Sequence, residues 1–228
     1  MLVTGVQPAP SFKSNAPSKH DNKGFIANGN IYDPAEYPYL IRLEIRISRA
    51  KYAICTGSLI SASFVLTAAH CTHRINNFSI KVFRPNTNEN YATVHRIYEH
   101  PYYNPIYGMA DVSLLKLAVP FNNVTKYTIL SGHPDEFANN TELSCFVLGF
   151  GDTGNPNNIY KNIGFITNVE VKYGSKACKL FSDELIKTTW QEFLCSKPDE
   201  HMICPGDSGG PLICHGFQYG IASHGYNF

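Results

Sequence analysis

Two short segments of this chain contain the residue types used in nucleophilic catalysis. The segment Gly206-Asp-Ser-Gly-Gly-Pro211 places a serine between glycines, and His70 stands in Leu66-Thr-Ala-Ala-His-Cys71. A serine hydroxyl becomes a nucleophile when a neighbouring imidazole takes its proton. The glycines allow the backbone N–H groups of Gly206 and Ser208 to point at one spot, where a tetrahedral oxyanion could accept both hydrogen bonds. The two segments together predict acyl-transfer chemistry.

A carboxylate that could support the imidazole is found in Asp111, which precedes the apolar run Val112-Ser-Leu-Leu-Lys-Leu117. A charged group at the mouth of an apolar strand must be partnered if it is buried, and an imidazole such as that of His70 would serve. The alternative for Asp111 is a strand-end residue that caps a turn. A lone His is more often structural than catalytic, so the catalytic interpretation depends on the presence of all three residues.

The order of these residues along the chain separates two kinds of serine hydrolase. Residues 206–210 also match G-x-S-x-G, the nucleophile elbow of α/β hydrolases, in which the acid and the His follow the Ser. After Ser208 this chain contains no Asp or Glu. The order found here, with the His and the acid upstream of the Ser, is that of a different and well-described Ser-His-Asp triad. The elbow interpretation is therefore excluded.

Two further motifs have simpler explanations. Residues 149–154 fit G-x-G-x-x-G, but Asn and Pro follow where a dinucleotide site needs a helix N-terminus, so we interpret the motif as a turn between strands. His70-Cys71-Thr-His73 offers three metal ligands, yet no H-E-x-x-H and no second close Cys/His pair completes a tetrahedral set. We interpret Cys71 as a disulfide partner and His73 as a surface residue, and we expect no metal and no cofactor.

The composition limits the function classes. The chain has 228 residues, of which 43% are hydrophobic and 16% charged, and its formal net charge is +1. These values predict an ordered globular chain without an electrostatic field for nucleic acid. The longest stretch without a charged residue or His, residues 52–69, contains Ser, Thr and Gly and is too polar to span a membrane. Neither nucleic acid nor a membrane is expected as a partner.

The cysteines and sequons indicate an extracellular protein. Seven widely spaced cysteines without a C-x-x-C pair are typical of disulfides rather than of zinc ligands, and their odd number leaves one outside the pairs. N-x-S/T sequons at Asn77, Asn123 and Asn139 agree with a secreted glycoprotein. The first twenty residues contain no apolar run of signal-peptide length, so we expect a secretion signal to lie upstream.

The elements that must position these residues are predicted to be strands. In residues 41–47, Ile and Leu alternate with charged side chains, which predicts a strand with one buried face. Helical patterns are limited to residues 175–181 and roughly 183–193, too few for an alternating βαβ plan. Further strand-like runs are separated by Gly, Pro and Asn clusters: residues 78–83, 112–117, 143–148, 165–171 and 218–222.

Three segments together resemble the trypsin-like (chymotrypsin-fold) serine proteases. Thr67-Ala-Ala-His-Cys71 is similar to the family's histidine motif, Asp111-Val-Ser-Leu-Leu to its aspartate motif, and Gly206-Asp-Ser-Gly-Gly-Pro211 to its serine motif. The similarity begins at Ile26, continues to the last residue and includes Tyr37-Pro-Tyr39, Gly149-Phe-Gly151 and Gly220-Ile-Ala-Ser223. The resemblance implies an all-β fold of two six-stranded antiparallel β-barrels with the site between them.

The same resemblance implies the domain organisation. Residues 1–25, rich in Pro, Ser, Lys and Asn and without periodicity, are expected to be an unpacked pro-segment or leader. Residues 26–228 are expected to form the protease domain. The family's final strand and C-terminal helix have no counterpart before Phe228, so we expect this domain to be truncated at its C-terminus.

By resemblance, Ser208 is the nucleophile, His70 the general base and then acid, and Asp111 the group that orients His70. Gly206 and Ser208 supply the oxyanion hole. Three disulfides are also implied: Cys55 with Cys71, Cys145 with Cys214, and Cys178 with Cys195. Cys204 is then left without its usual family partner.

The resemblance also implies activation by cleavage. Ile26-Ala-Asn-Gly29 resembles the mature N-terminus of the family, whose α-ammonium would pair with Asp207. The preceding residue is Phe25 rather than a basic residue, so our hypothesis is an activating protease that accepts aromatic residues, this protein included.

The substrate pocket is expected to be apolar. By resemblance Met202 forms its base beside Ile203, and Ser223, His224 and Gly225 lie at its wall. An apolar base would desolvate an Arg or Lys side chain without pairing it, so a chymotrypsin-like or elastase-like preference is expected.

The sequence therefore predicts a secreted, monomeric serine endopeptidase that is made as a zymogen and acts on proteins or peptides. An activating protease and protease inhibitors are its expected partners. The alternative is a non-catalytic homologue that acts as a binding or regulatory protein.

Overall fold

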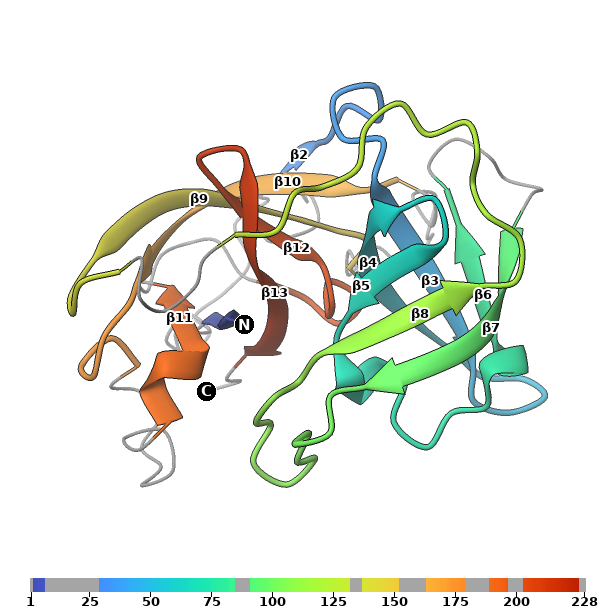
Figure 1. The fold of residues 1–228 in the computed structure, drawn as a ribbon, viewed down its shortest axis with the longest axis horizontal. Coiled ribbons are helices and arrows are strands. Elements are labelled where there is room, and N and C mark those ends of the chain that lie inside the picture. Colours follow the sequence, from blue (N-terminus) through green and yellow to red (C-terminus); the bar gives the residue numbers. More distant parts are fainter. Residues whose placement is uncertain are drawn as a thin grey trace, which may run out of the picture.

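Two strand-rich halves lie side by side in the computed structural model, one on the right and one on the left of Figure 1. The structure describes residues 2–6, 29–84, 91–131, 137–151, 163–178, 189–196 and 203–225. Within these residues, no helix has both the length and the apolar character needed to cross a membrane.

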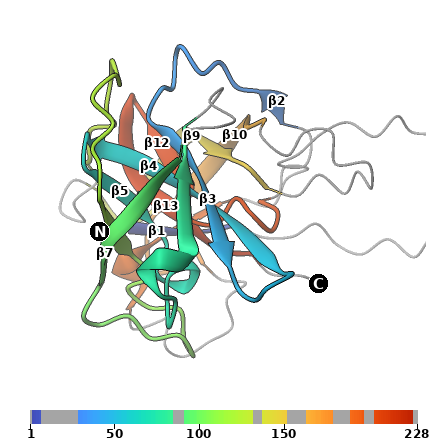
Figure 2. The same cartoon turned by 90° about the vertical axis from the view of Figure 1, so that its right-hand side faces the viewer.

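The first half is a closed barrel of six antiparallel strands in the order β3-β4-β5-β8-β7-β6, and it faces the viewer in Figure 2. Two short 3-10 helices, η1 (Ala69–Cys71) and η2 (Asn77–Ser79), follow β5. The strands are β3 (Leu40–Arg46), β4 (Tyr52–Ser61), β5 (Phe64–Thr67), β6 (Ile80–Phe83), β7 (Tyr91–Glu99) and β8 (Ser113–Leu117).

The second half is a seven-stranded sheet in the order β11-β1-β13-β12-β9-β10-β2, in which β10 also pairs with β11. This additional pairing closes six of the strands into a ring and leaves β2 at the edge. A 3-10 helix, η4 (Trp190–Glu192), precedes β11. The strands are β1 (Leu2–Val6), β2 (Asn30–Ile31), β9 (Glu142–Gly149), β10 (Phe165–Lys172), β11 (Phe193–Ser196), β12 (Pro211–Cys214) and β13 (Phe217–Gly225).

The expected all-β fold of two barrels is confirmed, with one difference in the second barrel. Its sixth strand is β1, which pairs in parallel with both β11 and β13, whereas the other strand pairings are antiparallel. These five residues belong to the segment 1–25 that the sequence predicts to be unpacked. β11 and β13 would otherwise each present a row of unpaired N–H and C=O groups, and β1 satisfies both rows.

Most of the expected strands occur, and the irregular positions have local causes. The runs expected at 112–117, 143–148, 165–171 and 218–222 lie in β8, β9, β10 and β13. The run expected from residue 78 begins as η2, because the side chain of Asn76 accepts a hydrogen bond from the N–H of Phe78 and caps that turn. The helix expected over 183–193 is described only from Thr189, and there the chain forms η4 and then β11.

The polar face of β3 is more buried than its alternating sequence predicts. Leu43 and Ile45 are at most 1% exposed, as expected for the core face. Arg42 on the other face is only 8% exposed, because its guanidinium lies 4.5 Å from the centre of the Phe83 ring and 3.4 Å from the carboxylate of Glu44.

Buried contacts join the two barrels. Leu59 of β4, Ile213 of β12 and Ile221 of β13 are at most 2% exposed and belong to one apolar cluster. The hydroxyl of Ser58 in β4 also donates a hydrogen bond to Oε1 of Gln218 in β13 at 2.7 Å. The junction is therefore packed like a protein interior, and groups placed there are held from both sides.

Candidate active site

His70 and Asp111 meet at the edge of the first barrel where β5 ends and β8 begins. Thr67 of β5 pairs with Ser113 of β8, so η1 leaves the barrel beside the point where the chain enters β8. Nδ1 of His70 lies 2.7 Å from Oδ2 of Asp111, and the backbone N–H of His70 donates to Oδ1 at 2.7 Å. Strand pairing thus brings together two residues that are 41 positions apart.

Asp111 is fully buried and is held as a carboxylate. Besides both groups of His70, the hydroxyl of Ser223 in β13 donates a hydrogen bond to Oδ2. Burial alone would raise the pKa of Asp111, but the hydrogen bond and charge of the His70 ring, the Ser223 hydroxyl and the His70 N–H together lower it. Because an ionised carboxylate only accepts, Nδ1 carries the ring hydrogen and Nε2 of a neutral ring keeps its lone pair.

Ser208 lies in the loop before β12, where the second barrel meets η1 and β4. The N–H of Thr56 donates to the carbonyl oxygen of Ser208 at 2.8 Å. Sγ of Cys71, the residue after His70, lies 3.7 Å from the same oxygen. This sulfur is part of a disulfide and has no hydrogen to donate, so the contact is one of packing. The structure therefore places Ser208 beside the segment that carries His70.

The loop around Ser208 has a left-handed backbone at Gly206, where φ is 108°. The N–H groups of Asp207, Gly209 and Gly210 each donate to a backbone carbonyl. For the N–H groups of Gly206 and Ser208, no acceptor is found among the residues that the structure describes. Two donors of one loop are thus left for another acceptor, which is the requirement for stabilising an oxyanion.

Asp207 is fully buried directly before Ser208. Its carboxylate accepts hydrogen bonds from the N–H of Gly151 at 2.7 Å and of Cys204 at 2.8 Å. Burial raises the pKa of Asp207 to about 7, although these two hydrogen bonds oppose the shift. A Cβ at Gly149 or Gly151 would overlap the carboxylate, so two glycines of the G-x-G-x-x-G motif leave room for Asp207. Residues 152–154 of that motif and Ile26, the expected partner of Asp207, lie outside the described residues.

The residues expected at the substrate pocket are only partly described. Ile203 is half-buried and packs against the core of the second barrel. Ser223 is buried and its hydroxyl is directed at the buried carboxylate of the His pair, a contact that no sequence pattern revealed. His224 and Gly225 lie in β13, where their backbones pair with β1, and Met202 lies outside the described residues.

Three disulfides join Cys55 to Cys71, Cys145 to Cys214, and Cys178 to Cys195. These are the pairs that the resemblance implied, and Cys204 is not part of them.

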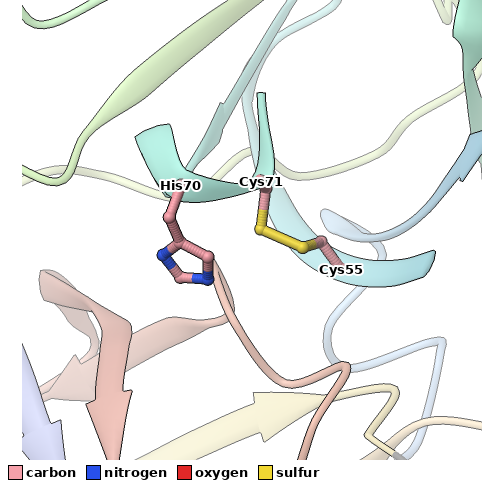
Figure 3. Close-up of side chains that lie close together, drawn as sticks. All are labelled: Cys55, His70 and Cys71. Atoms are coloured by element: carbon pink, nitrogen blue, oxygen red, sulfur yellow. A yellow bond between two sulfur atoms is a disulfide. The ribbon is translucent and has the colours of Figure 1, made fainter. Parts of the chain in front are cut away.

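The one group of possible metal ligands in the described part of the chain is formed by this first disulfide and His70 (Figure 3). The ligand atoms of Cys55, His70 and Cys71 lie within 4.8 Å of one another, but the two sulfurs are bonded to each other. A metal would need them as thiolates. His73, the other ligand weighed from the sequence, has Nδ1 3.1 Å from a carboxylate oxygen of Glu99. The disulfide therefore accounts for this cluster.

The three sequon asparagines differ in their surroundings. The side-chain amide of Asn77 donates to the carbonyl oxygens of Val94 at 3.0 Å and His95 at 2.9 Å. Asn123 and Asn139 are exposed. A glycan replaces one of the two hydrogens of this amide nitrogen, so glycosylated Asn77 would keep at most one of its two hydrogen bonds to β7.

Comparison with known proteins gives one family throughout. The sequence model of the Trypsin family matches residues 26–228. The chain is 32% identical over 210 residues to mast cell protease 2 of Ovis aries, covering 89% of this chain and 81% of that protein. It is 29% identical over 209 residues to chymotrypsin-like elastase family member 1 of Homo sapiens, covering 84% and 79%.

Solved structures share the fold. HL collagenase superposes with a TM-score of 0.69 at 24% identity, covering 86% of this chain and 85% of that one. The scabies mite inactivated protease paralogue S-D1 superposes with a TM-score of 0.66 at 21% identity, covering 86% and 84%.

Proposed function

The chain belongs to the trypsin family of serine proteases, and we propose that it is a secreted, monomeric serine endopeptidase. The observation that carries the proposal is the pair of His70 and the buried Asp111, joined by two hydrogen bonds of 2.7 Å beside the loop of Ser208. A carboxylate that fixes the tautomer of a His next to a Ser is the arrangement that activates a serine hydroxyl.

In the proposed reaction, Oγ of Ser208 attacks the scissile carbonyl carbon and Nε2 of His70 takes the hydroxyl proton. The negative oxygen of the tetrahedral intermediate accepts hydrogen bonds from the N–H groups of Gly206 and Ser208. The intermediate collapses as His70 returns the proton to the leaving amine, which breaks the peptide bond and leaves an acyl-enzyme. Water then attacks the acyl-enzyme with His70 again acting as base and then acid, which releases the new carboxyl end of the peptide and frees Ser208. Asp111 stabilises the imidazolium in both steps without taking the proton.

We propose further that the chain is made as a zymogen and is activated by cleavage before Ile26. Asp207 supports this proposal: among the described residues its buried carboxylate accepts hydrogen bonds from two backbone N–H groups and from no cationic side chain. A buried carboxylate without a counter-charge is costly. The new α-ammonium of Ile26 would neutralise it and fix the adjacent loop that contains Gly206 and Ser208. Because Phe25 precedes the bond to be cleaved, the proposed activating protease accepts aromatic residues.

The proposed substrates are proteins or peptides with an apolar residue before the scissile bond. Met202 and Ile203 support this preference, because they place no charge at the expected base of the pocket. A buried Arg or Lys of a substrate would stay unpaired there. Protein inhibitors that present the same kind of side chain are the proposed regulators of the activated form.

A non-catalytic binding role is the second candidate. Structural neighbours include a protease paralogue named as inactivated and human heparin binding protein, the latter with a TM-score of 0.65 at 22% identity. The fold is therefore compatible with either role, and the reactivity of the Ser208 hydroxyl distinguishes between them.

The test is covalent labelling of Ser208 by a fluorophosphonate probe before and after controlled cleavage between Phe25 and Ile26. We expect labelling only after cleavage, because the oxyanion donors are fixed once Asp207 is paired. Expression through a secretory pathway gives a second readout on the same sample, with glycans expected on the sequon residues Asn77, Asn123 and Asn139.

A matched Ser208→Ala sample shows whether any label is specific to that residue. Labelling of uncleaved protein at the rate of cleaved protein would refute the zymogen. A cleaved, folded protein that stays unlabelled would make the binding role the better interpretation.

The uncleaved chain is expected to lose stability as the pH rises from about 4 to about 7. An unfolded Asp titrates near 3.9, whereas burial raises the pKa of Asp207 to about 7. The folded chain therefore binds this proton more tightly, and the stabilisation is full below the unfolded pKa and lost as the pH rises through the folded pKa. Urea unfolding between pH 5 and 7 should show a fall of up to about 1.4 kcal/mol per pH unit from this group.

Asp207→Asn, which resembles the protonated acid, is the control because it lacks this titration. An identical pH dependence of the unfolding free energy in both proteins would show that Asp207 already has a counter-charge in the uncleaved chain.

A further inference from the structure

We propose that Thr56 of the first barrel is a positioning residue for the oxyanion hole of the second. The hydroxyl of Thr56 donates to the carbonyl oxygen of Gly206 at 2.8 Å, and its backbone N–H donates to the carbonyl oxygen of Ser208 at 2.8 Å. One residue of β4 thus holds the loop at both residues whose N–H groups are the proposed oxyanion donors. The inference rests on the proposed function, which supplies the reaction in which these donors act.

The hydroxyl of Thr56 is itself fixed in direction. It accepts a hydrogen bond from the N–H of Phe150 at 3.0 Å, so its single hydrogen is used for Gly206. The backbone carbonyl of Thr56 in turn accepts from the hydroxyl of Thr67 in β5 at 2.7 Å. Thr56 is 0% exposed, so water does not compete for these bonds. A buried network in which every member has its partner is rigid.

The loop needs such support from outside. Gly206 has no side chain and a φ of 108°, so nothing on the residue itself fixes the plane of its peptide groups. An oxyanion donor has to lie within a few tenths of an ångström of its productive place. The hydrogen bond from the Thr56 hydroxyl holds the peptide group between Gly206 and Asp207, and the bond from the Thr56 N–H holds the peptide group between Ser208 and Gly209. The donor peptides that precede Gly206 and Ser208 each adjoin one of these held groups.

The test compares three variants of β4. Thr56→Val keeps the shape of the side chain without the hydroxyl, Thr56→Ser keeps the hydroxyl without the methyl, and Ser58→Ala is the matched control. Ser58 is also 0% exposed, and its hydroxyl donates across the same junction, to Gln218 at 2.7 Å, without touching the loop of Ser208. Thr56→Ala, which leaves room for a water molecule, replaces Thr56→Val if the latter does not fold.

In the cleaved protein, Thr56→Val should lower kcat for a peptide amide by about 10- to 100-fold, somewhat less than the loss of one oxyanion donor, and leave KM nearly unchanged. Thr56→Ser should recover kcat to within a few-fold of the unaltered protein, and Ser58→Ala should not change it by more than that. An equal loss in Thr56→Val and Ser58→Ala, or a Thr56→Ser variant no better than Thr56→Val, would overturn the role of the hydroxyl.

A second readout does not depend on catalysis. Backbone amide exchange in residues 203–210 should be faster in Thr56→Val than in the unaltered protein, and should be unchanged in Ser58→Ala. If the unaltered, cleaved protein does not react with the fluorophosphonate, the proposed function fails while the exchange experiment still decides whether Thr56 holds the loop. Equal exchange in all the proteins would refute the positioning role, whatever the activity.

Discussion

Ser208→Ala is expected to lower kcat for a peptide amide by about 10⁶-fold, the largest effect of any single change in this chain. The variant keeps the pair of His70 and Asp111 and the N–H groups of the loop, so it removes the attacking atom alone. What remains is the rate that binding and oxyanion stabilisation provide without a covalent intermediate. Removing His70 as well should add little, because the members of such a triad act as a unit.

The measurement is kcat and KM of the cleaved protein, with the affinity of a non-covalent, substrate-like peptide inhibitor as the binding readout. Ser48→Ala, at an exposed position of the first barrel, is the matched control and should have no effect. A loss smaller than about tenfold in Ser208→Ala would show that another nucleophile acts. A binding role would instead survive this variant unchanged.

Asp111→Asn is expected to lower kcat by about 10⁴-fold, the loss measured for this exchange in another protease with a Ser-His-Asp triad. The contacts of Asp111 supply the physical reason here. Its two oxygens face only donors: the N–H of His70 at Oδ1, and Nδ1 of His70 together with the hydroxyl of Ser223 at Oδ2. An amide has one oxygen, so in either orientation its NH₂ group faces a donor.

The variant avoids two donors facing each other if the ring hydrogen of His70 moves from Nδ1 to Nε2. Nδ1 then accepts from the amide, and Nε2 can no longer take the proton of Ser208. Reaction with the fluorophosphonate should therefore slow as much as peptide hydrolysis does, while the KM for peptide changes little.

Asp33→Asn is the matched control, because Asp33 is exposed and its carboxylate accepts the N–H of Ala35 in a turn. Slowing by less than about tenfold in Asp111→Asn would mean that His70 keeps its tautomer without the carboxylate. The lowered pKa of Asp111 gives a second check: its stabilising contribution is present above the ordinary carboxyl pKa, is lost as the pH falls through its own pKa, and is absent in Asp111→Asn.

The sequence by itself determined the family, the all-β class and the identity of the candidate triad. These depend on short-range patterns: the motifs around His70, Asp111 and Ser208, the order in which they occur, and the alternation in residues 41–47. The long β4 and β5 hairpin was not predicted, because the run of residues 52–69 has no charged side chain to mark alternation. The three disulfides followed from the resemblance and could not follow from cysteine spacing, which leaves many pairings open.

Only the tertiary structure decided which groups support the triad and the loop of Gly206 and Ser208. Thr56 lies 150 positions from Gly206, and Ser223 lies 112 positions from Asp111, yet each donates a hydrogen bond to the other residue of its pair. Such contacts depend on the register of the strands and on the packing of one barrel against the other. The space that Gly149 leaves for Asp207 has the same origin. Local patterns record how a strand alternates, whereas the burial of distant segments against each other decides which of its side chains meet.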